Sequence, residues 1–146
     1  MRAVSVATRP ALDTLTAHER AALKKKAARQ AARRIVSHLV AGSPKELSDR
    51  AQDLLFTMTV QAATGGDFGR YFEPLDLGGK TKSHHSADLS VLTEAGLVER
   101  VNRNFVGGRP SWLYRPAVDA SALRQAFASE FARLEEVSGQ PESPSL

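Results

Sequence analysis

Residues 80–116 read KTKSHHSADLSVLTEAGLVERVNRNFVGGRPSWLYRP, and this stretch predicts one helix followed by one β-hairpin. Leu89 and Leu92 recur at helical spacing, and Gly96 supplies the flexible residue that commonly ends a helix. The helix is therefore expected over residues 82–95.

The hairpin is expected over residues 97–115. Residues 97–101 alternate between apolar and polar side chains, and residues 111–114 form a second short run rich in aromatic side chains. Between these runs lies the segment NFVGGRP, in which two glycines and a proline favour a turn. The rest of the chain is then expected to support this helix and hairpin.

A helix that ends in Ala-Gly-Leu-Val and runs into a ribbon with a Gly-Gly-Arg tip resembles the winged helix-turn-helix of bacterial and archaeal transcription regulators of the MarR and ArsR kind. The residues that carry the resemblance are Ser86, Leu89, Leu92, Glu94, Ala95, Gly96, Leu97, Val98, Gly108, Arg109, Pro110, Leu113 and Tyr114. The resemblance implies a mainly α fold with a small β-hairpin wing, extended by N- and C-terminal helices for dimerisation.

The resemblance also implies how such a domain would meet double-stranded DNA. In that family the helix lies in the major groove and the ribbon tip reaches the neighbouring minor groove or the backbone, as the groove widths allow. Carried over to this chain, the residues that face DNA are Lys82, Ser83, His84, Ser86, Ala87 and Ser90, with Arg109 at the wing tip. The chain departs from the pattern at Ala87 and Asp88, where such regulators often carry a long basic or amide side chain. We therefore expect affinity to come mainly from backbone contacts, DNA shape and the basic N-terminal helix.

The net charge of +4 is unevenly distributed. Residues 1–50 carry 11 basic and 4 acidic groups, residues 51–100 carry 4 and 7, and residues 101–146 carry 5 and 5. A basic segment beside a DNA-reading helix is the expected footprint of phosphate binding, although a solvated basic helix face is the alternative. The phosphate ligands predicted on this basis are Lys80, Lys82, Arg103 and, on the N-terminal helix, Lys26, Arg29 and Arg33.

Two capping boxes predict where the preceding helices begin. Thr16 and Glu19 form one, which opens a basic, alanine-rich helix over residues 16–42. Ser43 and Glu46 form the other, with Pro44 at the first helical position, and open the winged domain expected over residues 43–117.

The aromatic segment that follows, with Phe68, Tyr71 and Phe72, predicts a short helix over residues 68–72 that positions the reading helix. These aromatic side chains are expected to fill the core. The alternative left open is a small ligand-binding pocket built from the same three rings.

The two ends of the chain are expected to be irregular, with a loose arm over residues 1–15 and a disordered tail over residues 138–146. A C-terminal helix is expected over residues 118–137. Its apolar stripe predicts a two-fold dimer interface, with packing on its own chain as the alternative. The members of the stripe are Leu123, Phe127, Phe131 and Leu134.

Other kinds of site have little support in the sequence. Gly-Lys-Thr at residues 79–81 resembles the end of a phosphate-binding loop, but the first glycine of that motif would fall at Leu75. His84 and His85 point about 100 degrees apart on a helix, which disfavours joint ligation of a metal ion. We expect no catalytic residues, no metal, no cofactor and no membrane association, and nothing indicates a small-molecule effector.

The sequence therefore predicts a dimeric, cytoplasmic, sequence-specific DNA-binding regulator without catalytic activity. Two alternatives remain open. One is a winged-helix protein of plasmid or viral replication or partition, and the other is a winged helix that binds a protein partner instead of DNA.

Overall fold

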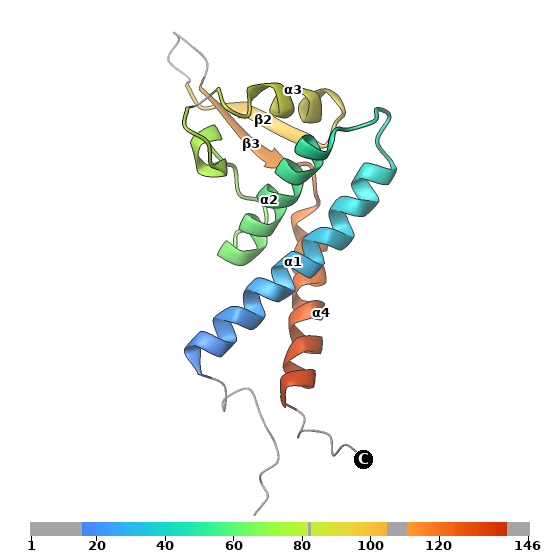
Figure 1. Cartoon of the computed structure of the whole chain (residues 1–146), viewed down its shortest axis with the longest axis vertical. Helices are drawn as coiled ribbons and strands as arrows, with labels where there is room; N and C mark the ends of the chain where they lie inside the picture. The colour runs from blue at the N-terminus through green and yellow to red at the C-terminus, as the bar shows by residue number, and fades with distance from the viewer. Residues whose placement is uncertain (1–15, 82, 105–110, 140–146) are drawn as a thin grey trace, which may run out of the picture.

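The computed structural model describes residues 16–81, 83–104 and 111–139. These residues form a mainly helical fold with one small antiparallel sheet, as the sequence predicts (Figure 1). In chain order the elements are α1 (Ala17–Ala41), α2 (Asp49–Gly65), the 3-10 helix η2 (Pro74–Leu77), α3 (Ser86–Glu94), β2 (Val98–Asn102), β3 (Trp112–Pro116) and α4 (Ala120–Gly139).

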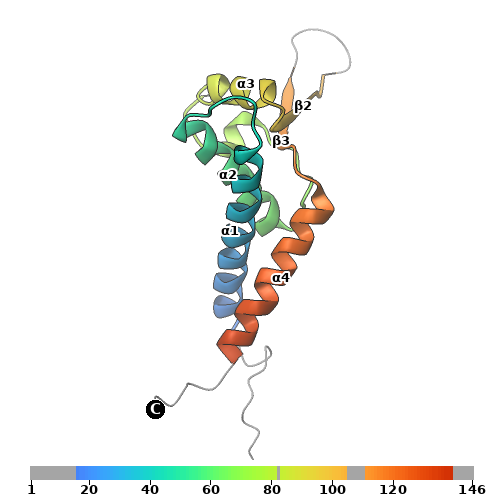
Figure 2. The same ribbon diagram turned by 90° about the vertical axis from the view of Figure 1, so that its right-hand side faces the viewer.

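Helix α1 begins at the predicted capping box. The hydroxyl of Thr16 accepts from the amide of Glu19 at 3.0 Å, and the Glu19 carboxylate accepts from the amide of Thr16 at 2.9 Å. The hydrogen bond from the Thr16 amide to the Glu19 carboxylate lowers the pKa of Glu19. The inner face of the helix consists of fully buried alanines, and these small side chains allow α4 to approach closely (Figures 1 and 2).

A carboxylate joins α1 to α4 between these closely packed helices. Glu130 of α4 is only 7% exposed and pairs with Arg34 of α1 and Arg133 of its own helix. Arg133 also donates to the side-chain oxygen of Gln30 at 2.8 Å. The hydrogen bond from Arg133 lowers the pKa of Glu130, despite the desolvation that opposes it.

Helix α4 begins at Ala120, two residues later than predicted, and continues to Gly139. Leu123 and Leu134 are buried within the single chain, whereas Phe127 and Phe131 are half-buried and stack with ring centroids 5.9 Å apart. Part of the predicted dimerisation stripe is therefore covered by the protein's own α1 and core. The expected arm (residues 1–15) and the tail beyond Gly139 lie outside the described residues.

The predicted start of α2 at Ser43 and Pro44 is wrong. Ser43 instead forms a local turn in which its hydroxyl accepts from the amide of Lys45 at 3.2 Å. The helix begins at Asp49, where the Ser48 hydroxyl accepts from the amide of Ala51 at 3.1 Å. Leu47, which lies between Ser43 and the helix, is buried in the core.

The predicted positioning helix over residues 68–72 is also wrong. Phe72 is extended and forms an isolated antiparallel bridge with Tyr114 of β3, with hydrogen bonds of 2.6 and 2.9 Å. The short helix lies further on, at Pro74–Leu77, because Pro74 supplies a suitable first helical residue. Phe72 is fully buried, so the expectation that this aromatic segment fills the core is confirmed for its last ring.

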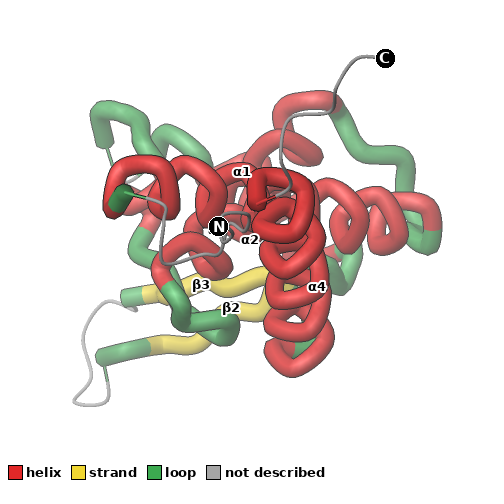
Figure 3. The backbone as a smooth tube through the Cα atoms, turned by 90° about the horizontal axis from the view of Figure 1, so that it is seen from below, coloured by secondary structure: helices red, strands yellow, loops and turns green. Residues whose placement is uncertain are grey.

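Strands β2 and β3 pair antiparallel, and Arg100 lies opposite Tyr114 in the register. Because Phe72 bonds to the other edge of β3, this strand has a backbone partner on both sides. Figure 3 shows the two strands side by side, next to the helices that carry the core. The hydrophobic core lies between α2, α3 and this sheet, and extends along α1 to α4.

Candidate nucleic-acid interface

Helix α3 is anchored by its inner face. Leu89 and Leu92 are buried in the core, and Gly96 follows the helix with a φ of 79°, a left-handed conformation that glycine adopts readily. The helix begins at Ser86 and not at residue 82, because Ser83 and His84 form a turn before it. The predicted helix is therefore present but shorter at its N-terminal end.

The outer face of α3 is polar and small. Of the residues predicted to face DNA, the structure exposes Ser83, His84, Ser86, Ala87 and Ser90. Lys82 lies outside the described residues, whereas Lys80 is exposed in the segment that leads into the helix. Short side chains on this face allow close approach of a partner surface.

Both acidic residues of α3 are paired with basic residues from earlier in the chain. Asp88 lies 3.7 Å from Nε of Arg50, and its side chain is only 17% exposed. Glu94 lies 3.3 Å from Nζ of Lys45, across 49 residues of sequence. The negative charges that the sequence places on this helix are thus offset locally. Lys45 and Arg50 were not among the predicted site residues, because nothing in the sequence indicates that they lie beside α3.

The two adjacent histidines have different surroundings. His85 is half-buried, and its Nε2 donates to the carbonyl oxygen of Leu77 at 3.1 Å, whereas His84 is exposed. Their rings meet edge to face, 4.7 Å apart. Within residues 16–81, 83–104 and 111–139, no group of three or more histidine, aspartate or glutamate side chains is arranged to hold a metal ion. His85 instead attaches the start of α3 to η2.

A glycine beside these histidines shapes the turn before α3. Gly79 has a φ of 103°, and a Cβ built there would lie 2.6 Å from the ring of His84. Only glycine therefore fits this close approach without displacement of His84. A hollow of about 230 Å³ opens nearby between α2 and the start of α3, with Arg50, His84 and Asp88 among its lining residues.

The described part of the ribbon carries three arginines with different partners. Arg103, predicted to bind phosphate, forms an exposed ion pair with Glu73 at 2.9 Å. Arg115 pairs with Glu99, also at 2.9 Å. Arg100 stacks on the ring of Trp112, with its guanidinium carbon 4.1 Å from the ring centroid. The predicted wing-tip residue Arg109 lies outside the described residues.

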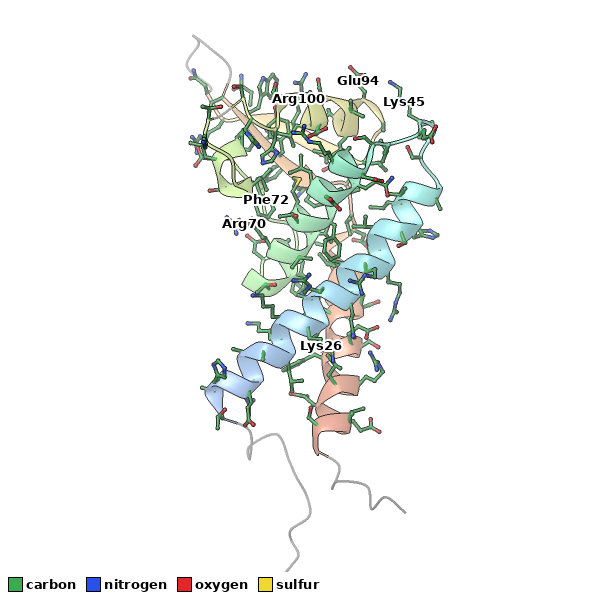
Figure 4. The ribbon with its side chains drawn as sticks, viewed as in Figure 1. Lys26, Lys45, Arg70, Phe72, Glu94 and Arg100 are labelled. Carbon is green, nitrogen blue, oxygen red and sulfur yellow. The ribbon has the colours of Figure 1, made fainter. Side chains whose placement is uncertain are left out.

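Lys26, one of the basic residues predicted to bind phosphate, lies on α1 far from α3 (Figure 4). Lys26, Arg29 and Arg33 are exposed, but Figure 4 places Lys26 far along α1, away from the end of the molecule that carries Lys45, Glu94 and Arg100. Within a single chain, Lys26 and α3 therefore lie at different ends of the described structure (Figures 1 and 4), and phosphate binding by Lys26, Arg29 and Arg33 stays a prediction.

The predicted alternative of an aromatic ligand pocket is not supported by the packing of its rings. Phe72 is fully buried in the core. The ring of Phe68 packs on that of Phe127, with centroids 5.8 Å apart. A separate apolar hollow of about 360 Å³ lies between α1 and the start of α4, lined in part by Ile35, Leu39 and Val118.

Comparison of the chain with known proteins finds no matching protein family, no matching curated protein and no matching solved structure. Among the helices that the structure describes, none combines the length and the apolar composition needed to cross a membrane.

Proposed function

We propose that this chain is a dimeric, sequence-specific double-stranded DNA-binding transcriptional regulator of the winged helix-turn-helix type. In this proposal α3 enters the major groove, and the ribbon of β2 and β3 contacts the adjacent minor groove or backbone. The protein acts in the cytoplasm and carries out no chemical reaction.

The observation that carries the proposal is the placement of α3. Its inner face is held in the core by Leu89 and Leu92, while its exposed face carries short side chains at Ser86, Ala87 and Ser90. The ion pairs of Asp88 and Glu94 partly offset the negative charges that would oppose phosphate approach. A rigidly anchored helix with a neutral outer face beside a ribbon suits docking into a groove.

The order of the sheet supports the same proposal. In space, β3 lies between Phe72 and β2. Along the chain, η2 and α3 come between Phe72 and β2. A winged helix would have this connectivity if its first strand were reduced to one bridge and its positioning helix to one 3-10 turn. The proposal therefore includes an unusually short positioning helix.

Dimerisation is the second part of the proposal. Phe127 and Phe131 remain half-buried on α4 after the chain has covered Leu123 and Leu134. We expect these two rings to contribute to a two-fold interface, which would present two copies of α3 to two half-sites. Light scattering coupled to size exclusion should give twice the monomer mass, and Phe131→Asp should shift the mass toward 15.8 kDa.

DNA binding is tested most directly by selection of duplexes from a random pool, followed by sequencing and gel shifts. A single palindromic site would support a regulator. A repeated or spreading footprint would favour the role in plasmid or viral replication or partition. Ser90→Glu should abolish binding, because it adds a negative charge to the outer face of α3, while Ser129→Glu on the exposed side of α4 serves as the matched control.

A specific observation favours one other function. Val91 is 38% exposed in the middle of the outer region of α3, and Val101 on β2 is 37% exposed. These two apolar side chains, on separate elements, would be covered if a protein partner bound there. If the wild-type chain bound no duplex even at low salt, the protein-interaction function would replace DNA binding.

A further inference from the structure

We infer that Arg100 and Trp112 form a preorganised clamp for a DNA phosphodiester beside α3. This inference rests on the proposed DNA-binding function and deepens it, because it assigns a phosphate contact to two residues that lie away from the wing tip. Arg100 is the binding group, and Trp112 is the positioning group.

The stacking geometry is the first argument. The guanidinium carbon of Arg100 lies 4.1 Å from the centroid of the Trp112 ring, which is close for a cation–π contact. Tryptophan is the best aromatic partner for such a contact, and stacking restricts the rotamers of the long arginine side chain. The guanidinium thus keeps its N–H edges available for a planar acceptor.

The absence of an acidic partner is the second argument. In the part of the chain that the structure describes, no carboxylate pairs with Arg100, whereas the other arginines near the sheet each have one. Arg103 pairs with Glu73, Arg115 with Glu99 and Arg70 with Asp76. Arg100 is therefore exposed, oriented and uncompensated, which distinguishes it from arginines that stabilise the ribbon.

The register of the ribbon supplies the third argument. Residues of a strand alternate between the two faces, so Arg100 shares a face with Val98, and the pair Glu99–Arg115 lies on the other. Val98 is buried in the core, which means that this face is turned toward the helices. Arg100 is the next residue after Val98 on this face of β2, and it lies at the end of the molecule that carries α3 (Figure 4).

The chemistry of the acceptor follows from the shape of the donor. A guanidinium presents paired N–H groups in one plane, which match two oxygens of a phosphodiester. A duplex whose major groove receives α3 would carry its backbone past the junction between α3 and the ribbon. A contact to phosphate positions the protein on DNA and carries no sequence information by itself.

The test compares Arg100→Ala with Arg124→Ala. Arg124 also stacks on an aromatic ring, that of Phe68 at 5.2 Å, but lies on α4. It therefore controls for loss of one positive charge and one stacking contact. Binding of selected and random duplexes is measured by fluorescence anisotropy of a labelled duplex between 50 and 200 mM salt, a range over which phosphate contacts dominate the salt dependence.

We expect Arg100→Ala to weaken binding roughly tenfold on both duplexes and to make the slope of log K against log salt less negative by about 0.9, the value for one lost phosphate contact. Arg100→Lys should lose affinity but keep a slope near that of the wild type, because it retains the charge without the planar fork. Trp112→Phe should fall between the wild type and Arg100→Ala. Arg124→Ala should match the wild type.

The fluorescence of Trp112 tests whether DNA binds beside this residue. Trp112 is the only tryptophan in the chain, so tryptophan fluorescence, excited selectively over the two tyrosines, reports on this clamp. Saturation with duplex should change the emission of the wild type. Equal affinities and slopes for Arg100→Ala and Arg124→Ala, with DNA binding otherwise intact, would overturn the clamp and leave the proposed function standing. A wild-type chain that bound no duplex would overturn both.

Discussion

Arg50 on α2 and Asp88 on α3 lie side by side, with Nε of the arginine 3.7 Å from Oδ2 of the aspartate. Asp88 is mostly covered, while Arg50 is largely exposed. The arginine therefore offsets a carboxylate that would otherwise lie at the edge of the proposed DNA-binding face.

Loss of this arginine should weaken DNA binding more than it weakens the fold. Arg50→Ala leaves Asp88 uncompensated, and we expect roughly a fivefold loss of affinity, equivalent to about 1 kcal/mol. Asp88→Asn in the same chain should recover most of that loss, because it removes the repelled charge. Anisotropy titrations of the two single variants and the double variant form the cycle. Additive effects would show that the pair does not act as a unit.

Two neighbouring residues of α3 should differ sharply in their contribution to stability. Leu92 is fully buried and Val91 is 38% exposed. Leu92→Ala should lower the free energy of unfolding by about 2–5 kcal/mol, because it removes apolar contacts and leaves a cavity. Val91→Ala should change it by less than about 0.5 kcal/mol, since alanine favours the helix. Urea unfolding measures both, and similar losses would contradict the anchored orientation of α3.

Substitution of Gly79 should be more costly than substitution of another glycine with a positive φ. Gly79→Ala would combine a φ of 103° with a methyl group 2.6 Å from the His84 ring, whereas Gly66→Ala at a φ of 78° meets nothing within 4 Å. We expect about 1 kcal/mol of destabilisation for Gly66→Ala, from backbone strain alone, and about twice that for Gly79→Ala. Thermal unfolding compares them. A larger shift for Gly66→Ala would show that the contact with His84 is unimportant.

Acid should loosen the contact between α1 and α4. Because hydrogen bonding by Arg133 lowers the pKa of Glu130 in the folded protein, this carboxylate adds stability that is complete above its unfolded pKa, near 4.5. That contribution is lost as the pH falls through the lower pKa of the folded state. Glu130→Gln should therefore be less stable than the wild type at neutral pH and should show a flatter decline in acid.

The measurement for Glu130 is urea unfolding at a series of pH values from neutral into the acid range. Glu136→Gln, at an exposed position of the same helix, controls for loss of one negative charge. A decline in acid that was equally steep in Glu130→Gln and the wild type would contradict the assigned role of Glu130.

Local signals in the sequence predicted several elements well. The capping box of Thr16 and Glu19 predicted the start of α1, and Gly96 predicted the end of α3, because each depends on residues within one turn of the chain. The hairpin was predicted to within about two residues by its alternation and its turn composition. The same kind of signal was misleading at Ser43, where a capping box lies before a buried leucine and no helix begins.

Elements that depend on distant partners could not be predicted. Phe72 is extended because it pairs with the backbone of Tyr114 in β3. The residues next to Phe72 in the sequence therefore did not indicate its extended conformation. The ion pairs of Asp88 and Glu94 join α3 to residues near the start of α2, and no local spacing indicates them. The sequence singled out Arg103 and assigned no role to Arg100 or Arg115, whereas the fold pairs Arg103 and Arg115 with carboxylates and stacks Arg100 on Trp112.

Residue patterns along the chain were enough to predict a mainly helical protein with one hairpin, a buried stripe on α3 and the turn residues that bound it. These features follow from hydrophobic periodicity and from glycine, both of which act over a few residues. The tertiary structure decided which charges α3 presents, where the basic face of α1 lies and which arginine remains unpaired on the ribbon. Those outcomes depend on which side chains meet across the fold, because an ion pair or a stacking contact forms only when packing brings its two members within a few ångströms.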